Sequence, residues 1–119
     1  YIRTGQIDSK FGFTLPNGQA LAAIQRVKEL PGLEFRGLHC HIGSQIFELE
    51  AFGQAVAVML ELAAAAKAAT GLITAELNMG GGLGIYYTAE DKPRTIREYA
   101  YVILGRVKEK VKKLNLPFP

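Results

Sequence analysis

The sequence contains no tryptophan and a single cysteine, Cys40. One cysteine cannot form a disulfide within the chain, which excludes a disulfide-stabilised scaffold and fits a reducing, cytoplasmic location. Long uninterrupted hydrophobic runs are also missing. The most apolar segment, residues 51–69, is interrupted by Gln54, Glu61 and Lys67, so it falls short of the roughly 20 apolar residues that span a bilayer. We expect a buried helix there and no membrane partner.

A strong charge of one sign is likewise absent. The formal net charge is +3, and part of the excess lies near the C-terminus, at Arg106, Lys108, Lys110, Lys112 and Lys113. This run lacks the interleaved aromatic residues that a nucleic-acid groove uses for stacking. We therefore expect a solvated helix face and no nucleic-acid partner.

The length of 119 residues and the 49% hydrophobic content are those of one ordinary globular domain. The chain begins at Tyr1 without an initiator methionine or a targeting pattern, and it ends in Leu116-Pro117-Phe118-Pro119, where a new strand could begin. We interpret residues 1–119 as a piece of a longer protein and expect part of any active site to lie outside it.

Helical periodicity and strand-like alternation follow one another along the chain. We expect a helix capped by Asn17 and ended by Pro31-Gly32, a strand over 33–42, a helix over 51–70 ended by Gly71, a strand over 73–79, and a helix opened by the capping box Thr95-Ile96-Arg97-Glu98. The apolar stripes expected to be buried are Leu21, Ile24 and Val27 in the first helix, Phe52, Val56, Met59, Leu60 and Ala63 in the second, and Ile96, Tyr99, Ala100, Ile103, Val107, Val111 and Leu114 in the third.

Strands that alternate with helices predict an α/β fold with a parallel sheet. Alternation places His39 and His41 on one strand face and Asn78 on the corresponding face of the other strand, away from the helices. Polar residues on an inward face favour a barrel over a doubly wound sheet. In both strands the chemically interesting residues fall at the C-terminal end, where parallel α/β folds bind ligands.

Three consecutive glycines, Gly80, Gly81 and Gly82, follow the second strand. Such a run costs backbone entropy and is tolerated where the backbone must approach something closely or adopt a positive φ. Successive exposed N–H groups form an anion site, so we predict a phosphate cradle; a tight turn without a ligand is the alternative. The spacing matches neither a dinucleotide fingerprint, which requires glycine at Ile85, nor a P-loop.

A second candidate segment, His39 to Gln45, lies at the end of the first strand. His41 is placed to lie flat against an aromatic ligand ring, Gly43 permits a sharp turn, and the Ser44 hydroxyl can donate to a phosphate oxygen. A structural role is the alternative for His41, and we favour it for His39. No third ligand at sensible spacing joins the two histidines, so we predict no metal site.

Cys40 and Lys10 are reactive residue types that we do not assign to chemistry. Cys40 points to the opposite strand face and is expected to pack under helices, whereas a nucleophilic cysteine needs an exposed, electropositive setting. Lys10 invites a Schiff-base interpretation, but it lies in a loop before the first strand. We expect a structural ion pair for it.

Several segments together resemble the alanine-racemase-like family of pyridoxal-phosphate decarboxylases, and within it the diaminopimelate decarboxylases. They are Thr4-Gly5, Ser9-Lys10-Phe11-Gly12, Gly37 to Gln45, Glu76 to Ile85, and Glu90-Asp91-Lys92-Pro93. The resemblance spans nearly the whole chain. It implies that residues 1–119 form the central part of a (β/α)₈ TIM-barrel domain, about two βα units and a leading helix, followed in the full protein by a β-domain.

The resemblance also implies a cofactor, pyridoxal 5′-phosphate. By similarity, His41 stacks on its pyridine ring, and Ser44 with the backbone of Gly80, Gly81 and Gly82 binds its phosphate. Asn78 stands where relatives often carry Asp, a departure not expected to abolish binding. No catalytic residue is assigned within this chain, because the family's Schiff-base lysine, its Glu-Pro-Gly segment and its C-terminal Cys and Tyr are expected outside it.

The activity implied for the parent protein is decarboxylation of meso-2,6-diaminopimelate to L-lysine, the last step of lysine biosynthesis, by a cytoplasmic homodimer. Two alternatives stay open. One is a related decarboxylase acting on ornithine, arginine or carboxynorspermidine, and the other is a non-catalytic pyridoxal-phosphate-binding barrel. A full barrel takes roughly 250 residues, so we expect the isolated chain neither to fold stably nor to catalyse.

Overall fold

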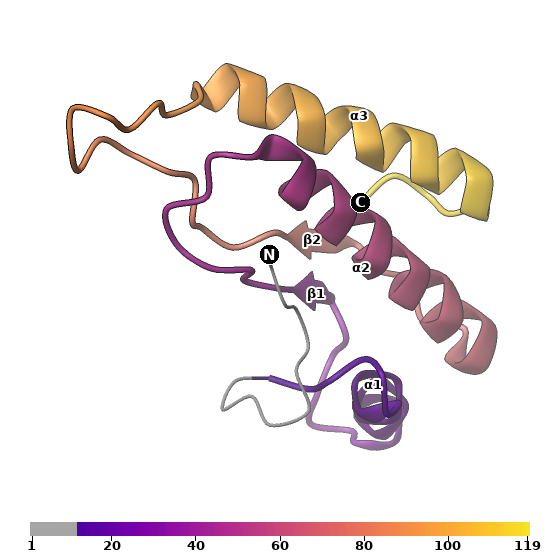
Figure 1. The fold of residues 1–119 in the computed structure, drawn as a ribbon. Coiled ribbons are helices and arrows are strands. Elements are labelled where there is room, and N and C mark those ends of the chain that lie inside the picture. Colours follow the sequence, from indigo (N-terminus) through magenta and orange to yellow (C-terminus); the bar gives the residue numbers. More distant parts are fainter. Residues whose placement is uncertain (1–11) are drawn as a thin grey trace.

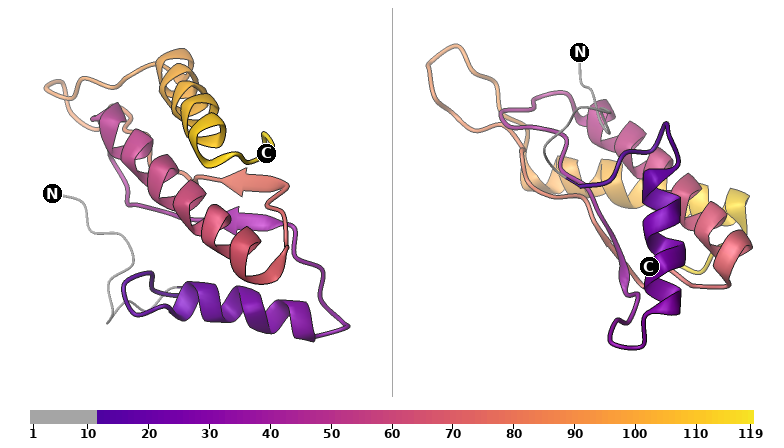
Figure 2. Two further views of the ribbon diagram at one scale, coloured as in Figure 1. Left: turned by 90° about the vertical axis from the view of Figure 1, so that its right-hand side faces the viewer. Right: turned by 90° about the horizontal axis from the view of Figure 1, so that it is seen from below.

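The computed structural model describes residues 12–119 and contains three helices and two strands in alternating order within that range. The elements are α1 (Gln19–Glu29), β1 (Gly37–His39), α2 (Leu49–Thr70), β2 (Glu76–Asn78) and α3 (Ile96–Leu114). All three helices lie on the same side of the two strands (Figures 1 and 2). This order confirms the predicted α/β alternation. The expectations for Thr4-Gly5, Ser9 to Phe11 and Lys10 lie outside the described residues.

The two strands pair in parallel, as predicted. Gly37 lies opposite Glu76, Leu38 opposite Leu77, and His39 opposite Asn78. Both strands are shorter than the predicted ranges 33–42 and 73–79, because regular pairing covers only three residues of each. The main-chain contact continues past the strand ends, where the Cys40 N–H donates to the Asn78 carbonyl at 3.0 Å.

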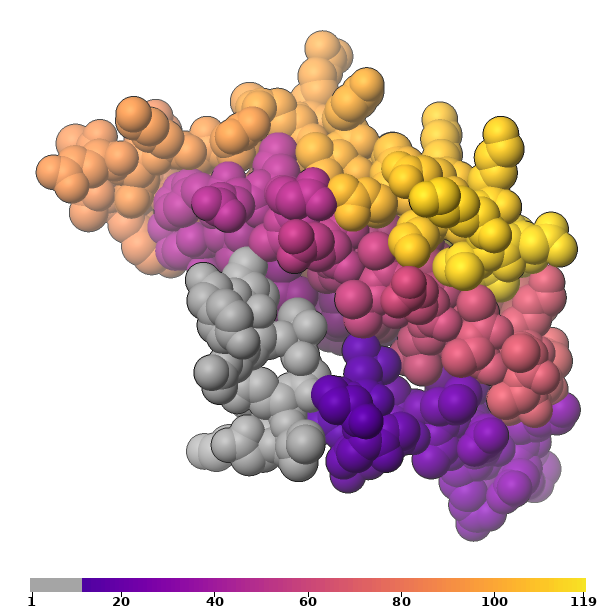
Figure 3. Space-filling view, turned by 45° about the vertical axis from the view of Figure 1, so that its right-hand side comes forward, coloured from indigo at the N-terminus to yellow at the C-terminus, as the bar shows by residue number. Residues whose placement is uncertain are grey.

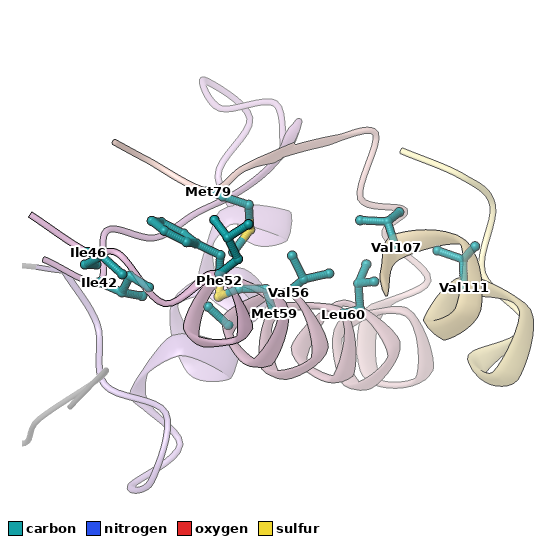
Figure 4. Close-up of a cluster of buried hydrophobic side chains, with 11 residues drawn as sticks. Ile42, Ile46, Phe52, Val56, Met59, Leu60, Met79, Val107 and Val111 are labelled. Atoms are coloured by element: carbon teal, nitrogen blue, oxygen red, sulfur yellow. The ribbon is translucent and has the colours of Figure 1, made fainter. Parts of the chain in front are cut away.

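Helix α2 is the centre of the hydrophobic core. Its side chains Phe52, Val56 and Leu60 are essentially inaccessible to solvent, and they meet Met79 from the sheet side and Val107 from α3 (Figure 4). The predicted stripe of α2 is therefore confirmed. By length and composition alone α2 would pass as a membrane span, but half of its most apolar window is buried within the protein, as in a core helix.

The third helix packs along α2 and begins as predicted. The Thr95 side chain accepts a hydrogen bond from the Glu98 N–H, and the Glu98 carboxylate accepts one from the Thr95 N–H, both at 3.0 Å. Tyr99 then meets Phe52 edge to face, with ring centroids 4.9 Å apart. One member of the predicted stripe is wrong: Ile96 is 79% exposed, since the first turn of α3 precedes the turn that reaches α2.

Two of the helices have, at one end, a glycine with a left-handed backbone conformation. Gly71 has φ 77° and donates its N–H to the Lys67 carbonyl, which ends α2 as predicted. At the start of α1 the prediction was wrong by one residue, because Gly18, with φ 77°, takes the N-cap position. Asn17 precedes it and accepts the Gln19 N–H on its side-chain oxygen at 3.2 Å. The helix end near Pro31-Gly32 is confirmed.

Candidate cofactor-binding site

The candidate site lies at the carboxyl ends of β1 and β2, where both strands run into loops on the same side (Figure 1). His39, His41 and Asn78 are exposed, whereas Cys40 and Ile42, which alternate with the histidines, face the core beneath the helices. This is the predicted division between a polar face and a helix-covered face. Burial raises the pKa of the Cys40 thiol, so the cysteine lies in the inert, packed setting that was expected.

The two loops that leave the strands are joined to each other by main-chain hydrogen bonds. The Ile46 N–H donates to the Gly82 carbonyl at 2.8 Å, and the Gly84 N–H donates to the Ile46 carbonyl at 2.8 Å. Ile46 and Leu83 form an isolated parallel bridge beyond the regular strands. Because of this pairing, the segment from His41 to Ile46 and the glycine segment are held side by side.

Gly80 and Gly82 are required by the chain's own packing. A Cβ on Gly80 would lie 2.4 Å from the Cys40 carbonyl oxygen, and a Cβ on Gly82 would lie 2.0 Å from the Gly43 carbonyl oxygen. Their φ values are 71° and 102°, in the region that disfavours side chains. These two glycines bring the His41 and Gly43 backbone into contact with the glycine turn.

Gly81 differs from both of its neighbours. A Cβ on it would meet no atom within 4 Å, and its φ is not in the left-handed region. Nothing in residues 12–119 therefore accounts for the missing side chain. The open space at Gly81 would permit close approach of a ligand to the backbone.

The N–H groups of the glycine turn do not all remain free. The Gly80 N–H donates to the side-chain oxygen of Asn78 at 2.8 Å, which leaves it engaged rather than available to a phosphate. Within the described range, the N–H groups of Gly81 and Gly82 donate no hydrogen bond. Gly80 therefore shapes the turn, and the phosphate-binding role of the three glycines stays a prediction.

His41 and Ser44 lie in the loop that pairs with the glycine segment. A Cβ on Gly80 would be 3.1 Å from the His41 ring nitrogen Nδ1, so the imidazole borders the turn while staying exposed. Ser44 is exposed and is flanked by Gly43 and Gln45, both of which contact the neighbouring loop. The loop that carries His41 and Ser44 therefore borders the glycine turn, whose Gly81 and Gly82 N–H groups donate to no atom of residues 12–119.

Two residues that shape the site were given no role from the sequence. The sequence places Asn78 on the inward face and predicts no contact for it, yet its side chain accepts the Gly80 N–H and organises the glycine turn. The sequence assigns no role to Gln45, yet its side-chain amide makes two hydrogen bonds to the backbone of Ile85. Only the sequence pattern Asn-x-Gly, which favours a side-chain-to-backbone turn, could have suggested the first.

A polar turn follows the site and leads to α3. The Asp91 carboxylate accepts the N–H groups of Thr88 and Tyr87 at 2.8 and 2.9 Å, and these bonds, that of Thr88 first, lower the pKa of Asp91. The segment from Ile85 to Thr95 projects from the body of the protein (Figure 3). Tyr86 and Tyr87 on it are exposed.

Comparisons with known proteins bear on the whole chain. The diaminopimelate decarboxylase of Bacillus subtilis is 40% identical over 119 residues, and that of Synechocystis sp. is 44% identical over 120 residues. Each match covers all of this chain and 27% or 25% of the relative. The crystal structure of diaminopimelate decarboxylase from M. jannaschii in co-complex with L-lysine matches with a TM-score of 0.82 at 28% identity, over 93% of this chain and 25% of that one.

The chain thus spans about a quarter of the length of the curated relatives it matches. Its two parallel strands and three helices are a part of the alanine-racemase-like barrel that binds pyridoxal phosphate. Residues 1–117 match the family described as "Pyridoxal-dependent decarboxylase, pyridoxal binding domain". The chain belongs to this family of pyridoxal-dependent decarboxylases, whose cofactor is pyridoxal 5′-phosphate.

Proposed function

We propose that the full-length protein containing this chain is a pyridoxal-phosphate-dependent decarboxylase that converts meso-2,6-diaminopimelate to L-lysine. In this proposal residues 1–119 are the central part of the barrel domain and contribute cofactor-binding segments only. The observation that carries the cofactor assignment is the match of residues 1–117 to the pyridoxal binding domain, and the open space at Gly81 is consistent with it. The substrate assignment is supported by the names of relatives that are 36–44% identical to the chain.

The residues proposed to hold the cofactor are His41, Ser44, Gly80, Gly81 and Gly82. Gly81 and Gly82 donate backbone N–H groups to the phosphate, Ser44 adds its hydroxyl, and Gly80 holds the turn that presents them. Charge-assisted hydrogen bonds of this kind are stronger than bonds between neutral groups. His41 offers an aromatic face beside the turn, on which the pyridine ring stacks.

When bound, the cofactor supplies an electron sink for the charge that develops as the bond to the carboxylate breaks. This chain's residues bind and orient it and move no proton in the proposed mechanism. They fix the phosphate at the carboxyl ends of β1 and β2, and so they fix which way the ring projects from the strands. The groups that transfer protons belong to the rest of the full-length protein.

The cofactor assignment is tested by Gly81→Ala in the full-length protein. The added methyl group meets no atom of residues 12–119 and no strained φ, so thermal stability without cofactor is expected to stay unchanged. The methyl group occupies the phosphate's space, and loss of one hydrogen bond to a charged group weakens binding roughly 10- to 100-fold. Pyridoxal phosphate affinity is measured by absorbance titration of the apoprotein, with Ser44→Ala in parallel.

Gly32→Ala is the matched control, because Gly32 is another exposed glycine with open space around its Cβ and no left-handed φ. It should leave both stability and cofactor affinity unchanged. Equal affinity of Gly81→Ala and the wild type would contradict the phosphate assignment. It would leave the turn as a purely structural feature.

The substrate is tested by release of CO₂ from meso-diaminopimelate, ornithine and arginine in separate assays of the full-length protein. Faster turnover of ornithine or arginine would assign a related decarboxylase. No release from any of them, with the cofactor bound, would assign a non-catalytic binding protein. We also propose that the full-length protein is a cytoplasmic homodimer, which light scattering of the purified protein tests for its oligomeric state.

A further inference from the structure

Gln45 combines an unusual backbone with an unusual side-chain contact. Its φ is 55°, in the left-handed region that residues other than glycine rarely adopt. Its side-chain nitrogen donates to the Ile85 carbonyl at 2.9 Å, and its side-chain oxygen accepts the Ile85 N–H at 3.0 Å. Both hydrogen-bonding groups of one main-chain residue are thus satisfied by a single amide side chain.

The contact continues the pairing of the two loops. Ile46, the next residue, makes main-chain hydrogen bonds to Gly82 and Gly84. Gln45 adds two hydrogen bonds to the Ile85 backbone through its side chain. In residues 12–119 no other side chain makes a hydrogen bond between the segments 41–46 and 80–85. The left-handed backbone and the side-chain contact occur at the same residue, where the loop meets its neighbour.

The position of Gln45 gives the contact a consequence for the site. It follows Ser44 directly, and Ile85 lies three residues after Gly82. The amide therefore ties the loop that carries Ser44 to the loop that carries Gly81 and Gly82. Without it, the hydrogen bonds between segments 41–46 and 80–85 that remain within residues 12–119 are the main-chain bonds of Ile46, which follows Gln45.

We infer that Gln45 is a positioning residue for the phosphate site. Its amide holds Ser44 and the glycine turn at a fixed separation before the ligand arrives, and so it reduces the ordering needed on binding. The inference rests on the proposed function, because it requires a phosphate-bearing ligand at Ser44 and Gly81. It assigns no contact between Gln45 and the cofactor itself.

The test is Gln45→Glu in the full-length protein, with pyridoxal phosphate affinity of the apoprotein measured from pH 5 to pH 8. An ionised carboxylate can accept the Ile85 N–H but cannot donate to the Ile85 carbonyl, whose oxygen it repels. Affinity at pH 8 is expected to fall roughly 5- to 30-fold relative to the wild type. The deficit should narrow at pH 5, where a larger fraction of the carboxyl is protonated and can donate.

Two further variants separate the amide from other effects. Gln45→Gly adopts the positive φ without strain and lacks the side chain, so it should fold, bind more weakly, and show the same ratio to the wild type at every pH. Gln25→Glu makes the same chemical change at an exposed position of α1 and should match the wild type throughout. Amide hydrogen exchange at Ile85, measured without cofactor, should speed up in Gln45→Gly, which lacks the acceptor, and stay slower in Gln45→Glu, whose carboxylate still accepts the Ile85 N–H.

The possible outcomes distinguish this inference from the proposed function. If the wild type binds pyridoxal phosphate and Gln45→Glu binds it equally well at every pH, the positioning role is overturned and the proposed function stands. A constant deficit with no pH dependence would also overturn it, since the donor would then be irrelevant. If the wild type binds no pyridoxal phosphate, the proposed function fails and this inference fails with it.

Discussion

Replacing Asn78 by alanine removes one hydrogen bond from the glycine turn. The Asn78 side-chain oxygen accepts the Gly80 N–H at 2.8 Å, on an exposed surface at the end of β2. The net contribution of such a bond is about 0.5–1.5 kcal/mol. If the turn has to be ordered again when the phosphate binds, about 1 kcal/mol lowers cofactor affinity roughly fivefold. Titration of the full-length apoprotein with pyridoxal phosphate measures this.

Asn78→Asp provides the conservative comparison, because a carboxylate retains an oxygen that can accept the Gly80 N–H. It also places a negative charge near the phosphate, and salt screens such a charge over about 8 Å at physiological ionic strength. We expect affinity within about threefold of the wild type at that ionic strength, and a smaller difference in added salt.

Asn17→Ala is a matched control, because Asn17 makes the same kind of bond to the N–H two residues ahead, that of Gln19, in the segment before α1. It should leave cofactor affinity unchanged. Wild-type or tighter binding by Asn78→Ala would refute the reasoning. The Gly80 N–H would then belong to the ligand, and Asn78 would compete with the phosphate for it.

Two more predictions concern the elements that support the site. Phe52→Leu should destabilise the full-length protein by about 1–2 kcal/mol, since Phe52 is fully buried and the substitution removes its edge-to-face contact with Tyr99. Denaturant unfolding measures the free energy of unfolding, and Tyr99→Phe is the control that keeps both aromatic rings. The hydrogen bond from the Thr95 N–H, and next Arg94, lower the pKa of Glu98. The start of α3 should therefore be fully stabilised above the ordinary glutamate pKa of 4.5 and lose that stabilisation as the pH falls through the lowered pKa of Glu98. Amide hydrogen exchange in the first turn of α3 should reveal this pH dependence in the wild type and not in Glu98→Gln.

The parts of the fold that could be predicted are those with a local cause. The capping box at Thr95 and the left-handed cap at Gly71 depend on residues within one turn, so the sequence pattern was sufficient. The buried stripe of α2 follows from helical periodicity alone. Parallel pairing of β1 and β2 followed from the intervening helix, because a parallel connection needs a crossover.

The errors arise where the outcome depends on neighbours in space. Ile96 fits the stripe of α3 by periodicity but lies before the first contact with α2. Strand length depends on where a partner is in register, which no single segment encodes. The contact of Gln45 was missed for the same reason, because its partner, Ile85, is forty residues away. No local pattern indicates a side chain that takes the place of main-chain hydrogen bonds between two strands.

The glycine motif shows how far composition can be interpreted as chemistry. From the sequence all three glycines look equivalent, and a phosphate cradle and a tight turn remained possible for each. The structure separates them, because Gly80 and Gly82 are fixed by contacts with Cys40 and Gly43, as any close turn would require. Conservation of those two residues would therefore be expected with or without a ligand. Gly81 alone discriminates between the two interpretations, so a substitution there tests the ligand, whereas a substitution at either neighbour tests only the fold.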